Sequence, residues 1–224
     1  MSGEMKNNGK PGDFSPDTNK KLILHQMSAM ILAGGESRRF GAPKVLQSFC
    51  DKPFLTRIVD ALTASELRQV YLVLGYKAET FRRKLPETGP LYIVKNPEYK
   101  YGQFSSIQAG IKALDNETLG VLSCLIDQPH ILPYTYHAVI MSACSAPNKI
   151  IIPTYQSRGG HPVYIPSTLF PEIVSSPPSW TLRDIFDDNS EEILRVEIND
   201  PGLTEDIDTK KDLRRIEVMY AENN

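Results

Sequence analysis

The chain has 224 residues, of which 41% are hydrophobic and 23% are charged, so it can fold around one sizeable core. Its 25 basic and 27 acidic residues give a net charge of −2, which argues against a general nucleic-acid-binding protein. Its longest apolar runs fall far short of the ~20 residues that a membrane helix needs. We therefore expect a soluble protein with neither a nucleic acid nor a membrane as its partner.

Residues 1–27 mix Gly, Pro, Asn, Lys and Asp around one short apolar run, Leu22-Ile23-Leu24. A signal peptide would need an apolar core of ~7 to 15 residues, so this segment is predicted to be a flexible tail. Residues 28–224 are then the single folded domain. The three cysteines are odd in number and far apart, which fits neither a disulfide framework nor a zinc site. Reduced thiols in the cytoplasm are expected.

From Ser28 onward, short apolar runs alternate with helical patterns, which is typical of an α/β fold with an open, mainly parallel sheet. A helix after Pro53 should pack an apolar stripe on the sheet, and Ser105 could cap another in which Gly110 allows close approach to neighbouring backbone. A last helix is expected from Thr209 to about Tyr220. Strands are predicted at residues 29–33, 70–74, 91–94, 121–126, 150–153, 162–165 and 194–198.

The first predicted strand leads into a glycine-rich loop at residues 32–44. Gly34 and Gly35 would let backbone N–H groups approach phosphate oxygens, and Arg38, Arg39 and Lys44 would offset their charge. The spacing fits neither a Walker P-loop nor the dinucleotide-binding fingerprint. On spacing alone, a polyphosphate site and an ordinary surface loop with turn glycines are equal alternatives.

Two acidic positions follow predicted elements later in the chain. Asp127 ends the strand at 121–126, where ligands bind in sheets of this kind, and a divalent cation would let it face a phosphate. The alternative is that it caps a helix beginning near Pro133. Residues 206–217 have the length of a calcium-binding EF-hand loop but lack its central glycine. Thr209 and Asp212 are better explained as the cap of the last helix.

The chain resembles MobA-like nucleotidyltransferases, particularly the molybdenum cofactor cytidylyltransferase branch. The family's blocks span about residues 28–216 in the family's order and consist of the loop at 32–46, Asn96-Pro97, Gly-Gln-Phe-Ser-Ser at 102–106, Asp-Gln-Pro at 127–129, Arg-Gly-Gly-His-Pro at 158–162 and Asp-Ile-Asp-Thr at 206–209. The resemblance implies a three-layer α/β/α sandwich with a mixed, mainly parallel sheet, similar to nucleotide-diphospho-sugar transferases and Rossmann-like folds.

The resemblance also implies Mg²⁺-dependent transfer of a nucleoside monophosphate from a nucleoside triphosphate to a phosphorylated acceptor, with release of pyrophosphate. By the same comparison, Asp127 and Asp208 would bind the metal, with Asp206 a weaker choice. The residues implied as catalytic are Arg39, Lys44 and Asp127. Those implied to bind the nucleotide are Leu32, Ala33, Gly34, Gly35, Arg38, Arg39, Lys44, Asn96, Ser105 and Ser106. Gly160 and His161 would contact the acceptor, although their block also reads as a hairpin turn.

The two branches of the family differ at positions that bear on the substrate. Gly34 resembles the guanylyl branch, because the cytidylyl branch usually has Ala at this position. The blocks at 102–106 and 158–162 instead resemble the cytidylyl branch. Phe40 and Cys50 stand where the family commonly has Met and Gly. CTP and molybdopterin are the expected substrates. The alternatives are GTP, a sugar or alcohol phosphate acceptor, or a non-catalytic cofactor chaperone that serves a molybdoenzyme partner.

Overall fold

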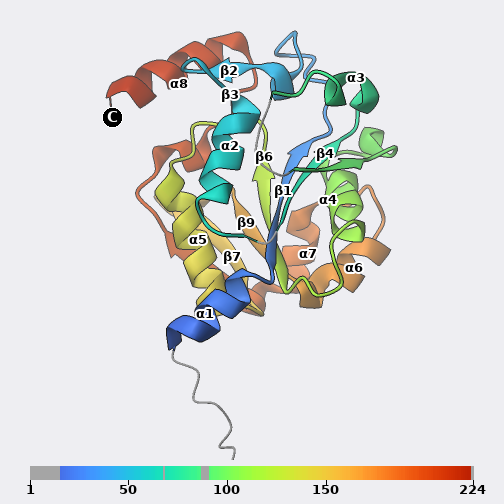
Figure 1. Cartoon of the computed structure of the whole chain (residues 1–224), viewed down its shortest axis with the longest axis vertical. Helices are drawn as coiled ribbons and strands as arrows, with labels where there is room; N and C mark the ends of the chain where they lie inside the picture. Colours follow the sequence, from blue (N-terminus) through green and yellow to red (C-terminus); the bar gives the residue numbers. More distant parts are fainter. Residues whose placement is uncertain (1–15, 68, 87–90, 223–224) are drawn as a thin grey trace, which may run out of the picture.

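The computed structural model describes residues 16–67, 69–86 and 91–222. One central sheet has the strand order β10-β7-β9-β6-β1-β4-β5, with β8 paired to β7 (Figure 1). Its strands are β1 (Met27–Ala33), β4 (Gln69–Leu74), β5 (Tyr92–Lys95), β6 (Gly120–Leu125), β7 (Ile150–Tyr155), β8 (Arg158–Gly159), β9 (Val163–Pro166) and β10 (Ile193–Glu197). β9 runs antiparallel to β6 and β7, and β8 antiparallel to β7, whereas the other pairs are parallel.

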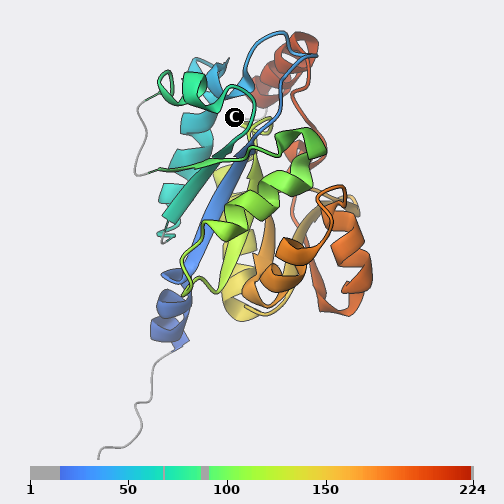
Figure 2. The same cartoon turned by 90° about the vertical axis from the view of Figure 1, so that its right-hand side faces the viewer.

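Helices cover both faces of this sheet (Figure 2). One face carries α2 (Phe54–Thr63), α3 (Ala78–Arg82), α5 (Pro133–Ser145) and α8 (Lys210–Glu222), and the other carries α4 (Gln103–Lys112), α6 (Phe170–Ser175) and α7 (Leu182–Asp188). A small hairpin, β2 (Ser48–Phe49) with β3 (Lys52–Pro53), precedes α2. The short 3-10 helices are η1 (Lys44–Leu46), η2 (Tyr99–Tyr101), η3 (Ser167–Leu169), η4 (Ser190–Glu192) and η5 (Pro201–Thr204). The predicted three-layer α/β/α sandwich is confirmed.

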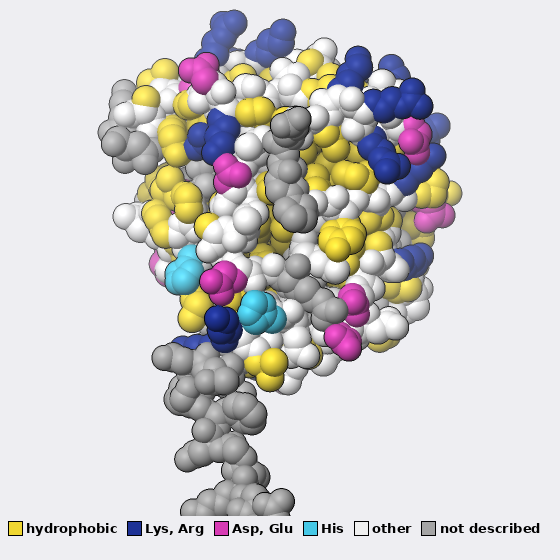
Figure 3. Space-filling model, viewed as in Figure 1, with side chains coloured by type: hydrophobic (Ala, Val, Ile, Leu, Met, Phe, Trp, Pro, Cys, Tyr) yellow, Lys and Arg dark blue, Asp and Glu magenta, His cyan; other side chains and the backbone are white. Residues whose placement is uncertain are grey.

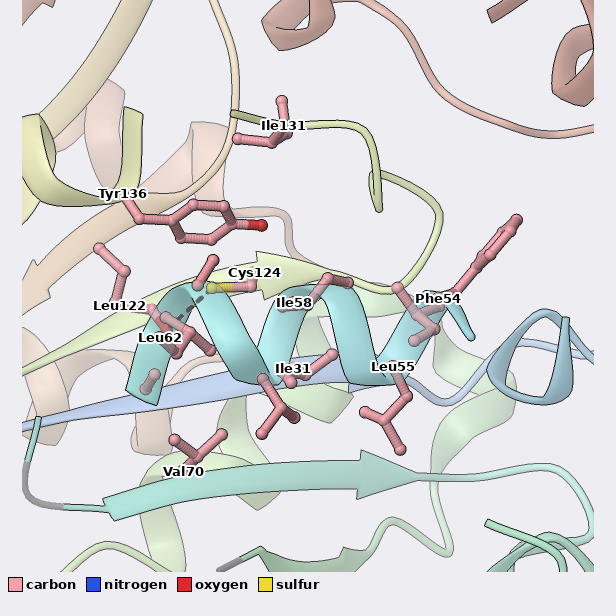
Figure 4. Packing of buried hydrophobic residues seen from close by; sticks show 14 of the residues in the cluster. Ile31, Phe54, Leu55, Ile58, Leu62, Val70, Leu122, Cys124, Ile131 and Tyr136 are labelled. Carbon is pink, nitrogen blue, oxygen red and sulfur yellow. Dashed lines mark hydrogen bonds between the residues drawn. The ribbon is translucent and has the colours of Figure 1, made fainter. Parts of the chain in front are cut away.

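The core explains why the central strands are apolar throughout. Successive side chains of β1 point to opposite faces, and all seven of its residues are buried because both faces are covered. Ile31 packs on the α2 side and Met30 on the α4 side. Figure 4 shows Leu55 and Ile58 of α2 lying over the sheet, as the apolar stripe after Pro53 predicts. No helix in the described ranges is long and apolar enough to span a membrane.

Gly110 does allow close packing of α4 on the sheet, but against side chains rather than against the expected backbone. A Cβ atom at this position would lie 2.7 Å from Met30 Sδ and 3.3 Å from Val73 Cγ2. The capping role of Ser105 is wrong, because α4 begins earlier, at Gln103, directly after Gly102 with its positive φ of 107°. The Ser105 hydroxyl instead donates to the carbonyl oxygen of Gly102 at 2.8 Å.

The structure differs from the predicted flexible tail over residues 16–27. Residues Pro16–Leu24 form α1, which contacts α5, and β1 already begins at the buried Met27. The reason is the apolar run, because Ile23 and Leu24 pack against the core while Leu22 stays 58% exposed. Residues 1–15 lie outside the described residues.

Candidate active site

A cavity of about 340 Å³ lies at the carboxyl ends of β1 and β6. Four separate segments line it: the loop after β1, the region of α3 to α4, the end of β6 and the residue two before α8. Of the residues implied by the family resemblance, those that line it are Leu32, Ala33, Gly34, Gly35, Arg38, Arg39, Lys44, Ser106, Asp127 and Asp208. The loop and the two acids that the resemblance implies as metal ligands, Asp127 and Asp208, therefore line one cavity.

The glycine-rich loop is held by its own hydrogen bonds and by the turn after β4. Ser37 adopts a positive φ of 53° and its carbonyl oxygen accepts hydrogen bonds from the N–H groups of Phe40 and Gly41. Its hydroxyl accepts from the Lys44 N–H at 3.3 Å, which fixes the start of η1. At the other end, the carbonyl oxygen of Gly34 accepts from the Tyr76 N–H at 3.1 Å. The loop backbone is thus fixed on both sides of the cavity.

Two acids that are distant in the chain, Asp127 and Asp208, both contact the ammonium group of Lys44 in this cavity. The Lys44 ammonium donates to Asp127 Oδ2 at 3.0 Å and to Asp208 Oδ1 at 2.8 Å. Arg39 Nη2 lies 3.0 Å from the other oxygen of Asp208. Lys44 is buried, with 8% of its surface exposed, whereas the Arg39 side chain is 74% exposed. The carboxylates therefore point into the cavity and lie within reach of a single positive ion.

Local hydrogen bonds hold both acids in place. Asp127 lies in the turn that follows β6, and its carbonyl oxygen accepts from the Ile207 N–H at 3.0 Å. Thr209 N donates to Asp212 Oδ2 at 2.8 Å, and Asp212 N donates to Thr209 Oγ1 at 3.2 Å. This reciprocal cap of α8 confirms the expected one and fixes the backbone next to Asp208.

Asp127 does not cap α5, so the alternative role considered for it is wrong. Leu132, the residue before that helix, donates its N–H to Asp200 Oδ2 at 3.1 Å instead. Thr135 Oγ1 donates to the same oxygen at 2.6 Å. Asp200 therefore accepts the hydrogen bonds at the start of α5, and the Asp127 carboxylate lines the cavity instead.

A third acid, Asp206, lies beside this pair. Gln128 Nε2 donates to Asp206 Oδ1 at 2.9 Å. Burial raises the pKa of Asp206, and the nearby negative charge of Asp127 raises it further. Asp206 does not line the cavity, so Asp208 is the better-placed partner of Asp127.

The polar residues after β5 form a buried cluster. Asn96 Nδ2 donates to the hydroxyl oxygens of Ser105 and Ser106, each at 3.0 Å, and Asn96 Oδ1 accepts from the Glu98 N–H at 2.9 Å. Only Ser106 of these three implied residues lines the cavity. Asn96 thus fixes the hydroxyl of Ser106 at the cavity wall, and it fixes that of Ser105 outside the cavity.

Gly160 and His161 also lie outside the cavity lining. A Cβ atom at Gly160 would lie 2.2 Å from the carbonyl oxygen of Leu203, so this glycine allows close packing against η5. Burial lowers the pKa of His161 to about 4, and the negative charge of Asp127 partly opposes this shift. Its Nε2 atom has no hydrogen-bond partner among the described residues.

Sequence reasoning missed the aromatic wall of the cavity, which includes Phe81 and Tyr99. The Tyr76 ring packs edge-on against both, with centroids 6.3 Å and 6.2 Å away. Gln103 also lines the cavity, and it stands in the block at 102–106, which could have pointed to it. Nothing in the sequence singled out Phe81, because α3 is a short helix that contributes one turn.

Basic side chains gather over α3, the helix that contributes Phe81 to the cavity wall. Lys and Arg side chains gather over α3 (Figure 3), where Lys77, Arg82, Arg83 and Lys84 are exposed. A second cavity of about 810 Å³ lies between α5, η5 and α8, and the described residues that line it include Glu205 and no lysine or arginine. Because phosphate recognition needs cations, the smaller cavity is the better nucleotide site.

The donor set fits a divalent metal that is shared with substrate phosphates. Asp127 and Asp208 supply hard carboxylate oxygens, and Mg²⁺ is usually held by one or two carboxylates plus phosphates and water. Within residues 16–67, 69–86 and 91–222, no three or more His, Cys, Asp or Glu side chains gather as a complete protein cage. The protein side of the site therefore matches a metal that arrives with a phosphate ligand.

Comparison with known proteins agrees with this geometry. The family model of the MobA-like NTP transferase domain matches residues 29–193. The chain belongs to this family. It is therefore a nucleotidyltransferase of the MobA-like type that uses a nucleoside triphosphate, and the matched range contains the loop, Lys44 and Asp127.

Two curated relatives carry names from molybdenum cofactor synthesis. The chain is 23% identical over 202 residues to the molybdenum cofactor cytidylyltransferase of Escherichia coli K12, covering 89% of this chain and 100% of the relative. It is 31% identical over 112 residues to a probable molybdenum cofactor guanylyltransferase of Geobacillus sp. WCH70, covering 49% of this chain and 54% of the relative.

Solved structures confirm the fold. The homologue of Mycobacterium tuberculosis Rv0371c from Mycobacterium sp. strain JC1 superposes with a TM-score of 0.74 at 22% identity, covering 89% of this chain and 99% of the other. The M. tuberculosis Rv0371c complex with manganese has a TM-score of 0.69 at 21% identity and covers 85% of this chain and 97% of that one.

Proposed function

We propose that the chain is a molybdenum cofactor cytidylyltransferase, which transfers CMP from CTP to molybdopterin and releases pyrophosphate in a Mg²⁺-dependent reaction. The observation that carries this proposal is the joint position of Asp127 and Asp208, both within 3.0 Å of the Lys44 ammonium and opposite the glycine-rich loop. Carboxylates in such a place would repel a triphosphate unless a divalent cation separated them.

In this reaction the chain's residues would mainly position substrates and offset charge. Backbone N–H groups around Gly34 and Gly35 would face the phosphates, with Arg39 and Lys44 binding the triphosphate. Asp127 and Asp208 would hold Mg²⁺, which when bound neutralises phosphate oxygens and stabilises the leaving pyrophosphate. The manganese in the Rv0371c complex supports a divalent ion in this fold. Gly160 and His161 would contribute on the acceptor side.

One comparison favours CTP as the donor, and the one feature that resembles the guanylyl branch does not oppose it. The relative matched over its whole length is named as a cytidylyltransferase, whereas the guanylyltransferase match covers 54% of that relative. Gly34, the guanylyl-like feature, also has a packing role that does not involve the base: a Cβ atom there would lie 2.7 Å from Ser106 Oγ. This glycine is therefore compatible with either nucleotide.

The proposal is tested by pyrophosphate release with CTP, GTP, ATP and UTP, each with Mg²⁺ and molybdopterin. We expect the highest rate with CTP and a loss of at least about 100-fold in Asp127→Asn, because the nearby acid Asp206 is hydrogen bonded to Gln128 and does not line the cavity. Asp187→Asn is the matched control, since Asp187 is exposed on α7 outside the cavity. Its rate should equal that of the wild type.

Three outcomes would contradict parts of the proposal. A wild-type rate in Asp127→Asn would show that Asp127 is not a metal ligand. A higher rate with GTP than with CTP would show that GTP is the donor. Tight nucleotide binding without turnover, across all donors and with sugar and alcohol phosphates as acceptors, would identify a cofactor carrier instead.

A further inference from the structure

Lys44 occupies a position that a metal ion would also need. Its ammonium is hydrogen bonded to Asp127 Oδ2 and Asp208 Oδ1, at 3.0 Å and 2.8 Å. A divalent cation bound by the two acids would need carboxylate oxygens of the same pair. Two positive ions at such short range repel each other strongly where water is scarce, and Lys44 is 8% exposed. The ammonium and the metal therefore compete for one pair of acids.

We propose that Lys44 is an exchangeable counter-ion, which holds Asp127 and Asp208 together until the phosphates of a nucleotide draw its ammonium away. Metal binding is then weak without nucleotide and strengthened by it. This inference rests on the proposed function only in placing the triphosphate at the glycine-rich loop. It makes the lysine and the metal alternate partners of the acids.

The side chain can make this exchange without a change of backbone. The Lys44 N–H donates to Ser37 Oγ at 3.3 Å, and its carbonyl oxygen accepts from the Gln47 N–H at 3.0 Å. Both contacts fix the main chain of η1. Lysine carries its charge on a flexible four-carbon stem, and Lys44 lines the same cavity as Gly34 and Gly35. Its ammonium can therefore turn from the acids to a phosphate in that cavity.

Arg39 makes a similar contact but a weaker one. Its Nη2 atom lies 3.0 Å from Asp208 Oδ2, yet its side chain is 74% exposed, against 10% for Lys44. Exposed ion pairs are screened by water and contribute little. In addition, Arg39 contacts one of the acids and Lys44 contacts both. Lys44 is thus the residue that limits metal binding, and Arg39 offers a matched control.

Thermodynamic linkage gives the exchange a second consequence. If phosphate removes Lys44 from the acids and so favours the metal, the metal must favour phosphate binding by the same factor. Nucleotide and metal would then enter as a cooperative pair. A mutant without the ammonium would bind metal well with no nucleotide present, although it would bind phosphate poorly.

The test measures Mn²⁺ alone, by the electron paramagnetic resonance signal of the free ion, in a titration of the full chain without nucleotide. Lys44→Met is expected to bind Mn²⁺ about tenfold more tightly than the wild type. Arg39→Met should stay within about twofold of the wild type. The double variant Lys44→Met with Asp127→Asn should lose the gain, which places the ion at the acids. Lys44→Gln replaces Lys44→Met if the latter does not fold, with the same expectation.

Equal or weaker Mn²⁺ binding in the lysine variant would overturn the inference, as would an undiminished gain in the double variant. The titration involves no turnover, so its result is separate from that of the proposed function. If the wild type turns over CTP but Lys44→Met shows no gain in Mn²⁺ affinity, only the proposed exchange is refuted. The gain without turnover of any nucleoside triphosphate removes the proposed activity and supports the exchange.

Discussion

His161 is a buried residue whose protonation should make the fold sensitive to acid. Burial lowers its pKa from 6.5 to about 4. Between these values the unfolded chain takes up a proton that the folded chain does not, so the stability linked to this ring is complete above pH 6.5 and is lost as the pH falls toward 4. We expect the free energy of unfolding to fall by about 2 kcal/mol from pH 7 to pH 5 on account of His161 alone.

Urea unfolding of the wild type and of His161→Gln at both pH values measures this contribution. The variant should lose about 2 kcal/mol less than the wild type over that interval. His130 is also buried with a lowered pKa, so part of the pH dependence should remain in both proteins. His25→Gln serves as the control because His25 is exposed. The same pH dependence in His161→Gln and the wild type would show that this ring is not the responsible group.

The fate of individual residues shows what residue type and spacing can predict. The loop after β1, the turn after β6 and the segment before α8 meet at the carboxyl ends of β1 and β6. This meeting brings together Arg39, Lys44, Asp127 and Asp208. The bond from Lys44 to both acids was not foreseen, because it depends on how packing orients the three side chains. For the same reason the sequence could not distinguish Ser106, which lines the cavity, from the serine before it.

At the scale of elements, two helices begin with the same hydrogen-bonded cap but lie at different distances from the site. Thr181 with Asp184 caps α7, and Thr209 with Asp212 caps α8 directly after Asp208. Thr209→Ala and Thr181→Ala should each lower the free energy of unfolding by about 1 kcal/mol, measured by urea denaturation. Only Thr209→Ala should also raise the Mg²⁺ concentration needed for half-maximal pyrophosphate release, because it loosens the backbone next to Asp208, the proposed metal ligand.

Thr181→Ala is therefore the matched control, because it removes the same kind of cap from a helix that does not follow Asp208. If both variants changed the Mg²⁺ requirement equally, the effect would come from general destabilisation. If neither changed it while both were destabilised, the α8 cap would have no part in holding Asp208.

The elements themselves were predictable where strands are short, apolar and bounded by turns. All seven predicted strands form, and their ends differ by up to two residues, as in β1, which begins at Met27 rather than Ala29. Errors fall where local signals are weak. α1 was missed because two partly buried side chains, Ile23 and Leu24, are enough to dock it, and the start of α4 was set by the positive φ of Gly102 rather than by a serine cap.

At the scale of the whole molecule, the alternation of strands and helices indicated a sheet covered on both sides, and the family resemblance indicated a mixed one. The insertion of β9 between β6 and β7 could not be derived from local patterns, since it separates two strands that follow each other among the long strands and pairs β6 with a segment far along the chain. Because β9 runs antiparallel to β6, with Val163 opposite Ser123, the loop before β9 that contains Gly160 and His161 lies at the carboxyl end of β6, the end that leads to Asp127.

Because the site joins four segments of the chain, a ligand that bridges them should stabilise the whole fold. A ligand at 100 times its dissociation constant adds about 2.7 kcal/mol to the free energy of unfolding, which corresponds to roughly 5 to 10 °C in a chain of this size. We expect CTP with Mg²⁺ to raise the Tm by this order, and GTP with Mg²⁺ to raise it less. EDTA should remove most of the shift, because the phosphates would then face two carboxylates without a cation between them.

The double variant Asp127→Asn with Asp208→Asn supplies the control for this metal dependence. Without the two negative charges, CTP should give a smaller shift that EDTA hardly changes, since the metal no longer joins the acids to the phosphates. A shift with GTP larger than that with CTP would contradict the cytidylyl proposal and leave the MobA-like family assignment untouched. An EDTA-sensitive shift of full size in the double variant would place the metal away from these acids, and with it the catalytic site.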